Sequence, residues 1–177
     1  MRVKKIALMI LIIAGLPILI LLFFNLPWVI IHTGAWFSPR PLEPTITRGE
    51  FPFRIDYKIG EEKFTVKDTF IAEFDGFGWN AGHGRYRLWR GWIKGSKESN
   101  LLLISDDIRK VYVFVGNAEF YMNDERWPIE RPFTPHIFMV KIEGVESSIM
   151  FEEELMKEYS IKIIEYSFSE PIINSFR

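Results

Sequence analysis

The sequence predicts an α+β protein, with an N-terminal transmembrane helix followed by a mostly antiparallel β domain that carries one helix near its C-terminal end. Three observations predict it: an uncharged apolar run at the N-terminus, period-two alternation over much of the remaining chain, and one late segment with helical spacing. The chain has 177 residues, enough for one domain and an appendage. We expect a cytoplasmic tip over residues 1–5, a transmembrane helix over 6–31, a proline-rich linker over 32–50 and an extracytoplasmic domain over 51–177.

The N-terminal apolar run has the length and charge pattern of a membrane anchor. Residues 6–24 carry no charge, and as a helix they would extend roughly 28 Å, close to the thickness of the hydrocarbon core of a bilayer. Arg2, Lys4 and Lys5 precede the run, so the positive-inside rule places the N-terminus in the cytoplasm and the rest of the chain outside the cell membrane. A cleaved signal peptide, with small residues at 33–35, is the alternative, but its apolar segment is usually shorter.

Alternation of apolar and charged residues predicts the β domain. Residues 53–59 alternate strictly, and a turn at Gly60 leads to a returning strand over residues 64–74. Three further apolar segments predict strands, and a fourth fits either a strand or a short helix; the strands are 101–104, 136–142 and 161–168, and the ambiguous segment is 85–92.

Two segments of the C-terminal half predict a central strand and a helix. Residues 111–115 are β-branched or aromatic throughout, which indicates a strand covered on both faces, and Gly116-Asn117 predicts a hairpin turn into a strand over 118–122. The helix is expected over 151–159, where three glutamates in the first turn suit the helix dipole. Its apolar residues would share one face: Phe151, Leu155, Met156 and Tyr159.

Composition and missing motifs argue against several classes of function. Lys and Arg number 22 and Asp and Glu 23, a balance that argues against nucleic acid as a partner. The absence of Cys excludes disulfides, thiolate metal sites and a Cys nucleophile. The motifs H-E-x-x-H, G-x-S-x-G and S-x-x-K are also missing, so we expect no metal site, no cofactor and no serine hydrolase chemistry.

Residues 74–92, FDGFGWNAGHGRYRLWRGW, form the most unusual segment. It combines five glycines, three tryptophans and three arginines, and exposed Trp and Arg together stack well on a sugar, a peptide or a lipid headgroup. The competing interpretation is a long β connection, in which glycines meet turn geometry and tryptophans cover the sheet. The candidate binding residues are Trp79, Arg85, Arg87, Trp89 and Trp92.

These features predict a non-catalytic binding or accessory module at the cell envelope. The lipid bilayer is the expected partner of residues 6–31, and a protein or a wall polymer is the expected partner of the exported domain. The alternative is an envelope hydrolase that uses carboxylates, with Asp75 and His83 as the candidate participants.

Several segments resemble one group of bacterial proteins. They are TITRGEFPFRIDYKIGEE, VKDTFIAEFDGFG, residues 86–89 (YRLW) and EEELMKEYSIKIIEYSFSEPIINSF. In this order they resemble uncharacterised membrane-anchored proteins of Gram-positive bacteria. The resemblance implies one N-terminal span and a small extracytoplasmic domain, and it implies no activity.

Overall fold

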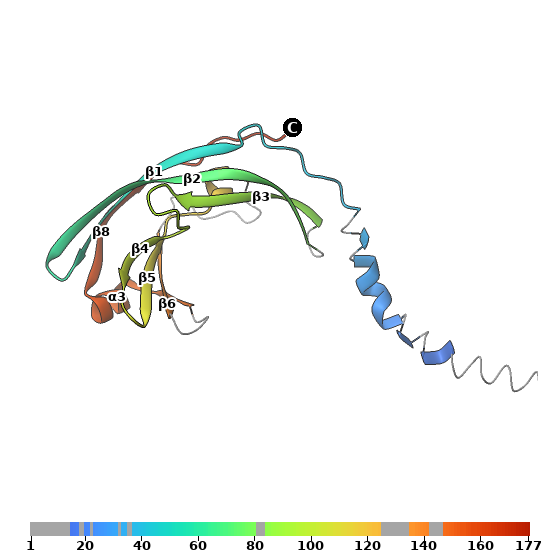
Figure 1. Cartoon of the computed structure of the whole chain (residues 1–177), viewed down its shortest axis with the longest axis horizontal. Coiled ribbons are helices and arrows are strands. Elements are labelled where there is room, and N and C mark those ends of the chain that lie inside the picture. Colours follow the sequence, from blue (N-terminus) through green and yellow to red (C-terminus); the bar gives the residue numbers. More distant parts are fainter. Residues whose placement is uncertain are drawn as a thin grey trace, which may run out of the picture. The chain divides into compact units, whose positions relative to one another are not determined.

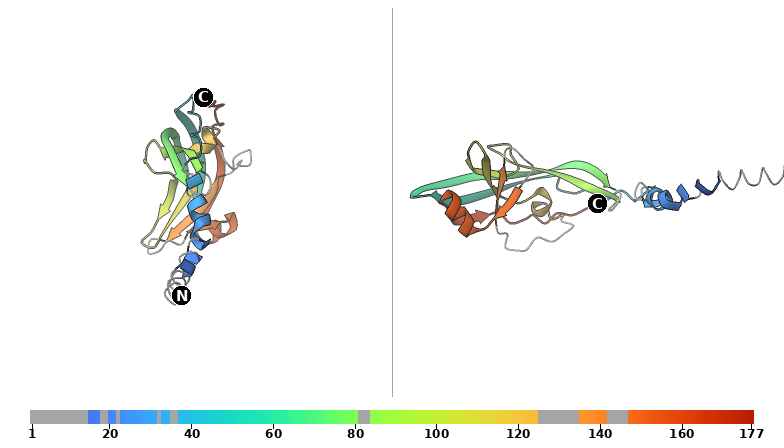
Figure 2. Two further views of the ribbon diagram at one scale, coloured as in Figure 1. Left: turned by 90° about the vertical axis from the view of Figure 1, so that its right-hand side faces the viewer. Right: turned by 90° about the horizontal axis from the view of Figure 1, so that it is seen from below.

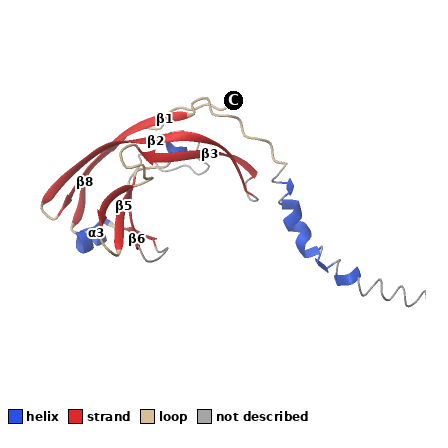
Figure 3. Cartoon of the chain, viewed as in Figure 1, coloured by secondary structure: helices blue, strands red, loops and turns tan. Residues whose placement is uncertain are grey.

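The computed structural model describes residues 15–17, 20–21, 23–31, 33–34, 37–80, 84–124, 135–141 and 147–177. The chain forms two compact units, of which unit 1 comprises Met1–Pro41 and Phe77–Arg87, and unit 2 comprises Leu42–Gly76 and Leu88–Arg177. The described elements are mostly antiparallel strands with a few helices, which confirms the predicted α+β class in its β part (Figure 3).

The first sheet has the strand order β3-β2-β1-β8. Its strands are β1 (Arg48–Ile59), β2 (Glu62–Asn80), β3 (Gly84–Ile93) and β8 (Ile161–Phe168). β1 and β2 form the predicted hairpin, and Gly60 in its turn has a φ of 59°, a conformation that glycine adopts without strain. The ambiguous segment 85–92 is part of β3 and is therefore a strand. β8 pairs with β1 as a fourth strand (Figure 1).

The second sheet has the order β4-β5-β6-β7. Its strands are β4 (Leu101–Ser105), β5 (Arg109–Phe114), β6 (His136–Lys141) and β7 (Ser147–Met150). β5 lies between two neighbours as predicted, but only the face that carries Val111 and Val113 is fully buried. One row on the other face crosses all four strands and ends in exposed aliphatic side chains: Leu102, Tyr112, Phe138 and Ile149.

The expected hairpin at Gly116-Asn117 is wrong, because residues Ala118–Tyr121 form a short helix, α2. The Oδ1 atom of Asn117 accepts a hydrogen bond from the backbone N–H of Phe120 at 2.7 Å, which caps the helix. Gly116 does have the positive φ expected of it, 106°, but it turns the chain into a helix rather than into a strand. Asn is as good an N-cap as it is a turn residue, so the dipeptide alone could not decide between the two.

The predicted late helix is α3 (Glu152–Tyr159), and it buries less than expected. Leu155 is fully buried, whereas Phe151, the residue before the helix, is 72% exposed and Met156 is 38% exposed. Arg109 of β5 connects the second sheet to this helix, through an ion pair with Glu158 at 3.3 Å and a guanidinium placed 5.0 Å from the ring centre of Tyr159.

Aromatic side chains join the two sheets of unit 2 into one core. Figures 1 and 2 show the backbones of these strands. Tyr121 of α2 has no exposed surface and stacks on Phe51 of β1 with ring centres 4.5 Å apart. It also packs against Phe70 of β2 at 5.2 Å, and its hydroxyl donates a hydrogen bond of 2.6 Å to the carbonyl of Val115. α2 therefore fixes the relation between the first sheet and the strand β5.

Unit 2 begins earlier than the expected domain boundary at residue 51. The backbone of Glu43 exchanges two hydrogen bonds with Arg177, and Thr45 pairs with Ser175. Residues 42–50, expected as the end of the proline-rich linker, thus belong to the folded unit, and Glu43 and Thr45 pair with its last residues.

All described residues between 15 and 34 are helical. No helix among the described residues combines the length and the apolar character needed to cross a bilayer. The expected cytoplasmic tip and residues 6–14 of the expected span lie outside the described residues, as do His83 and residue 142 of the strand expected over 136–142.

Candidate functional site

The glycine-rich segment, interpreted either as a binding surface or as a long β connection, is almost entirely strand in its described residues. Its described residues belong to the second half of β2 and to β3, and Gly76 has a φ of 93° that is compatible with a local irregularity in β2. The five candidate residues therefore lie along two long strands, and the structure separates them into two groups.

Trp89 and Trp92 lie in unit 2, where Trp89 is part of the core rather than of an open surface. Trp89 is 8% exposed, packs edge-on against Phe74 with ring centres 5.4 Å apart, and donates its indole N–H to Oδ2 of Asp124 at 2.7 Å. Trp92 is half-buried. For Trp89 the competing interpretation, a tryptophan that covers the sheet, is thus the better one.

Trp79, Arg85 and Arg87 lie in unit 1, at the hairpin end of β2 and β3. Trp79 is 37% exposed, Arg85 is exposed and Arg87 is half-buried. We call residues 77–80 and 84–87 the hairpin end. Ser38 and Arg40, which follow the N-terminal helix, contact the hairpin end.

Ser38 and Arg40 bind the hairpin end from the linker side. The backbone N–H of Arg85 donates a hydrogen bond of 2.9 Å to Oγ of Ser38. The guanidinium of Arg40 lies 4.1 Å from the ring centre of Phe77, which is close enough for a cation–π interaction. The hairpin end is thereby attached to the chain only a few residues beyond the helix.

A pocket of about 320 Å³ lies beside α2 in unit 2. We call it the α2 pocket. Both sheets and the helix line it, with aromatic walls from Phe70, Trp89, Phe114 and Phe138 and polar groups from Ser99, Asn100, Asn117 and Glu119. Its volume is at the lower end of the range of small-molecule sites.

The polar groups of the α2 pocket suit a neutral ligand that both donates and accepts hydrogen bonds. Oδ1 of Asn100 is buried and has no hydrogen-bond partner among the described residues, which is costly and favours a donor that reaches it. Oδ1 of Asn117 already accepts from Phe120, so its amide group retains N–H donors. Among the described residues that line the pocket there is no Lys, Arg or His, so an anion would find no counter-charge.

The polar residues of the α2 pocket give no binding signal in the sequence, because they are ordinary turn and cap residues. Asn100 ends the loop before β4, while Asn117 and Glu119 begin α2. The one available signal was Asn117-Ala118-Glu119, which reads as a helix start as well as a turn.

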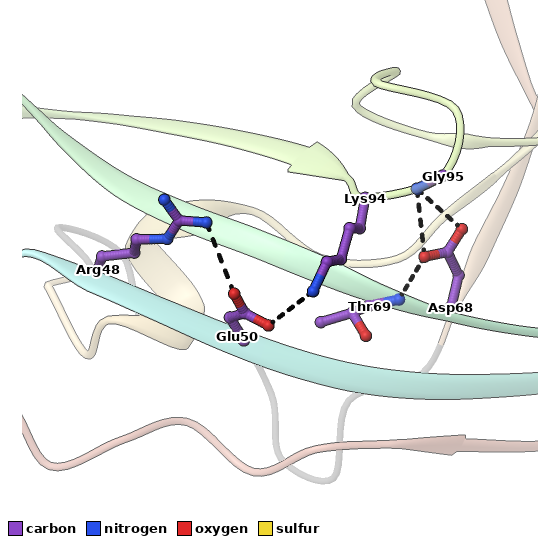
Figure 4. A network of polar contacts seen from close by, with 6 residues as sticks. All are labelled: Arg48, Glu50, Asp68, Thr69, Lys94 and Gly95. Carbon is purple, nitrogen blue, oxygen red and sulfur yellow. Dashed lines mark hydrogen bonds and ion pairs between the residues drawn. The ribbon is translucent and has the colours of Figure 1, made fainter.

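A polar network on unit 2 fixes the loop that follows β3 (Figure 4). The carboxylate of Asp68 accepts hydrogen bonds from the backbone N–H groups of Thr69 and Gly95, at 2.6 Å and 3.2 Å for the shorter contact of each. Beside it, Glu50 pairs with Lys94 at 3.2 Å and with Arg48 at 3.5 Å. These carboxylates are occupied in holding strands and a loop together, which is a structural task.

Asp75, the carboxylate considered for hydrolysis, has structural surroundings, and so does the exposed carboxylate of Asp106. Asp75 forms an ion pair of 2.7 Å with Arg90, and both side chains are at least half exposed. Asp106 accepts hydrogen bonds from the backbone N–H groups of Ile108 and Arg109, and these bonds lower the pKa of its carboxyl group. A general acid needs the opposite, a carboxyl group whose pKa is raised by burial.

Comparison of the chain with protein-family models, curated proteins and solved structures found no match.

Proposed function

We propose that the chain is a single-pass membrane-anchored module that carries unit 2 on the extracytoplasmic side, where it binds a ligand without transforming it. The anchor is the helix expected over residues 6–31, with the N-terminus in the cytoplasm. The resemblance to membrane-anchored proteins of Gram-positive bacteria is consistent with this topology and supports a role at the cell envelope.

The observation that carries the proposal is the exposure of the N-terminal helix. Its described large apolar side chains are all about half exposed or more, from Ile31 at 47% to Phe23 at 71%; they are Leu16, Ile20, Leu21, Phe23, Phe24, Leu26, Trp28, Val29, Ile30 and Ile31. A helix that is apolar on all sides is stable in lipid or inside a large protein core. The sequence continues the same character back to Ile6, which extends the apolar run to the length of a span.

The ligand site that we propose is the α2 pocket, and its ligand class is a small neutral molecule rich in hydroxyl groups. Its aromatic walls suit the apolar faces of a sugar ring, while Asn100 and Glu119 accept hydrogen bonds from hydroxyl groups. The ion pair that holds Asp75 and the hydrogen bonds that lower the pKa of the Asp106 carboxyl group favour binding over hydrolysis.

Extraction of membranes at alkaline pH tests the anchor. The full chain is expected to stay in the membrane pellet, because only integral proteins resist this treatment. Leu16→Lys combined with Ile20→Lys places two charges near the middle of the span, each unfavourable by about 2.5–3.5 kcal/mol for insertion, and should release the chain. The matched control, Ile173→Lys at a residue 92% exposed in unit 2, should stay in the pellet. Release of the unmodified chain would refute the anchor.

Saturation-transfer NMR tests the pocket on the full chain in phospholipid nanodiscs, with neutral mono- and disaccharides as probes. We expect transfer to at least one of them, and its loss in Asn100→Leu. Glu153→Gln, an exposed change in α3, is the control and should retain it. Equal transfer in the Asn100 variant and the unmodified chain would contradict the site.

A further inference from the structure

We propose that the hairpin end of β2 and β3 is a second membrane contact, which lies on the headgroups of anionic phospholipids beside the anchor. The inference rests on the proposed function, because it takes the N-terminal helix to be in the bilayer. The chemistry of Trp79, Arg85 and Arg87 suits a sugar, a peptide or a lipid headgroup, and the inference assigns them the lipid headgroup.

Acidic residues are distributed unequally between the two units. All 23 acidic residues of the chain lie in unit 2, and unit 1 has none. The units are defined by contacts between residues and not by charge, so this separation is an independent property of the chain. The basic residues of unit 1 are Arg2, Lys4 and Lys5 before the helix and Arg40, Arg85 and Arg87 after it.

The hairpin end is attached to the part of the chain that follows the N-terminal helix. Thr33 donates its hydroxyl to the carbonyl of Val29 at 2.7 Å within the helix, and the backbone N–H of Phe37 then bonds to the carbonyl of Thr33 at 3.0 Å. Immediately afterwards Ser38 bonds to the backbone of Arg85 at 2.9 Å. If the helix ends at the bilayer surface near residue 31, the hairpin end is held at that surface.

The hairpin end exposes an aromatic and a basic side chain, Trp79 and Arg85. Tryptophan is enriched at the interface between hydrocarbon and water. Trp79, at the hairpin end, is 37% exposed. Arg85, also at the hairpin end, is exposed and carries a charge of the sign that anionic headgroups attract. A wall polymer or a protein could bind the same side chains, but neither would explain why this unit alone lacks acidic residues.

The experiment uses the full chain, labelled with 5-fluorotryptophan, in nanodiscs that contain lipids with a nitroxide on the headgroup. Each tryptophan has its own ¹⁹F signal, assigned by single Trp→Phe variants. We expect the Trp79 signal to broaden strongly in nanodiscs rich in phosphatidylglycerol, because the nitroxide relaxes nearby nuclei. Trp89, 8% exposed in the core of unit 2, is the internal control and should keep its line width.

Two comparisons test the role of charge. Removing Arg85 and Arg87 together, as Arg85→Gln with Arg87→Gln, should lower the equilibrium constant for contact of the hairpin end with lipid by about fivefold for each arginine lost, and so weaken the broadening of the Trp79 signal. Replacing Arg54 by Gln, an exposed arginine of β1 in unit 2, is the matched control and should leave the broadening unchanged. Equal broadening of Trp79 in phosphatidylcholine and phosphatidylglycerol nanodiscs would overturn the proposed preference for anionic lipid.

Trp28, 63% exposed on the N-terminal helix, separates the two proposals. Contact of Trp28 with lipid, together with a Trp79 signal no broader than that of Trp89, would overturn the second membrane contact and leave the anchor standing. Lack of contact at Trp28 would overturn the anchor itself and this inference with it. Contact at both Trp28 and Trp79 supports both.

Discussion

Tyr121→Phe tests whether α2 holds the two sheets of unit 2 together. The change keeps the ring that stacks on Phe51 and removes the hydroxyl that donates to the carbonyl of Val115. Both residues are fully buried, so the carbonyl loses its partner where water cannot replace it. Leaving a buried acceptor unpaired costs about 1–3 kcal/mol, and we expect a loss near 2 kcal/mol. This corresponds to a fall in Tm of roughly 4–8 °C.

Near-ultraviolet circular dichroism of the full chain in micelles of a non-ionic detergent measures this transition. Tyr166→Phe is the matched control, because Tyr166 is 42% exposed, and its change should stay within about 0.5 kcal/mol. A Tyr121→Phe chain as stable as the unmodified one would show that the buried hydrogen bond contributes nothing to the relation between α2 and β5.

The free energies of unfolding of the same two chains should depend differently on pH. Burial raises the pKa of Tyr121 above its ordinary value of 10.0. Above pH 10 the unfolded chain therefore loses this proton while the folded chain keeps it, and the free energy of unfolding falls by up to about 1.4 kcal/mol per pH unit. The Phe variant has no such proton, so the stability difference between the two chains should shrink as the pH rises above 10. A constant difference would contradict the burial of the hydroxyl.

Three further changes test the packing, the charges and the open face of unit 2. Gly91→Ala should lower the Tm, because the added Cβ would collide with the ring of the buried Phe70; overpacking of this kind costs about 1–3 kcal/mol, and an unchanged Tm would show that the ring can move. Hydrogen bonds from Arg54 and Thr65 lower the pKa of Asp56 below its ordinary value of 3.8. The ionised carboxylate therefore stabilises the fold above pH 3.8, and this contribution is lost as the pH falls through the lowered pKa. In acid unfolding monitored by circular dichroism, the stability of Asp56→Asn should depend less on pH than that of the unmodified chain. Ile149→Ser should leave the Tm unchanged and reduce self-association in analytical ultracentrifugation, since the side chain is 66% exposed at the end of the apolar row; a large loss of Tm would show that something covers it.

Most of the strands could be predicted because their signal is local. Residues 53–59 alternate because one face of β1 is buried and the other is not, and Gly60 marks the turn that follows. The short helix after Gly116 could not be predicted in this way, because Asn117 is equally suited to a tight turn and to a helix cap. The exposure of Phe151 and Met156 could not be predicted either, since it depends on the tertiary contacts of α3 and not on its helical spacing.

The candidate site shows the same division between local and tertiary information. The sequence singled out the glycine, tryptophan and arginine segment correctly as unusual, but only tertiary contacts separate Trp89, bound to Asp124 in the core, from Trp79 on the hairpin end. The α2 pocket has no sequence signature, because its walls come from strands that are distant in the chain: Phe70 from β2, Trp89 from β3 and Phe138 from β6.

Addition of a protease to intact cells tests the central claim most directly. With a tag at the C-terminus of the full chain, a membrane-anchored unit 2 outside the cell should be degraded without lysis, while a cytoplasmic marker protein stays intact. Survival of the tag until the cells are opened would contradict the account, because it would place the β-structured unit on the cytoplasmic side.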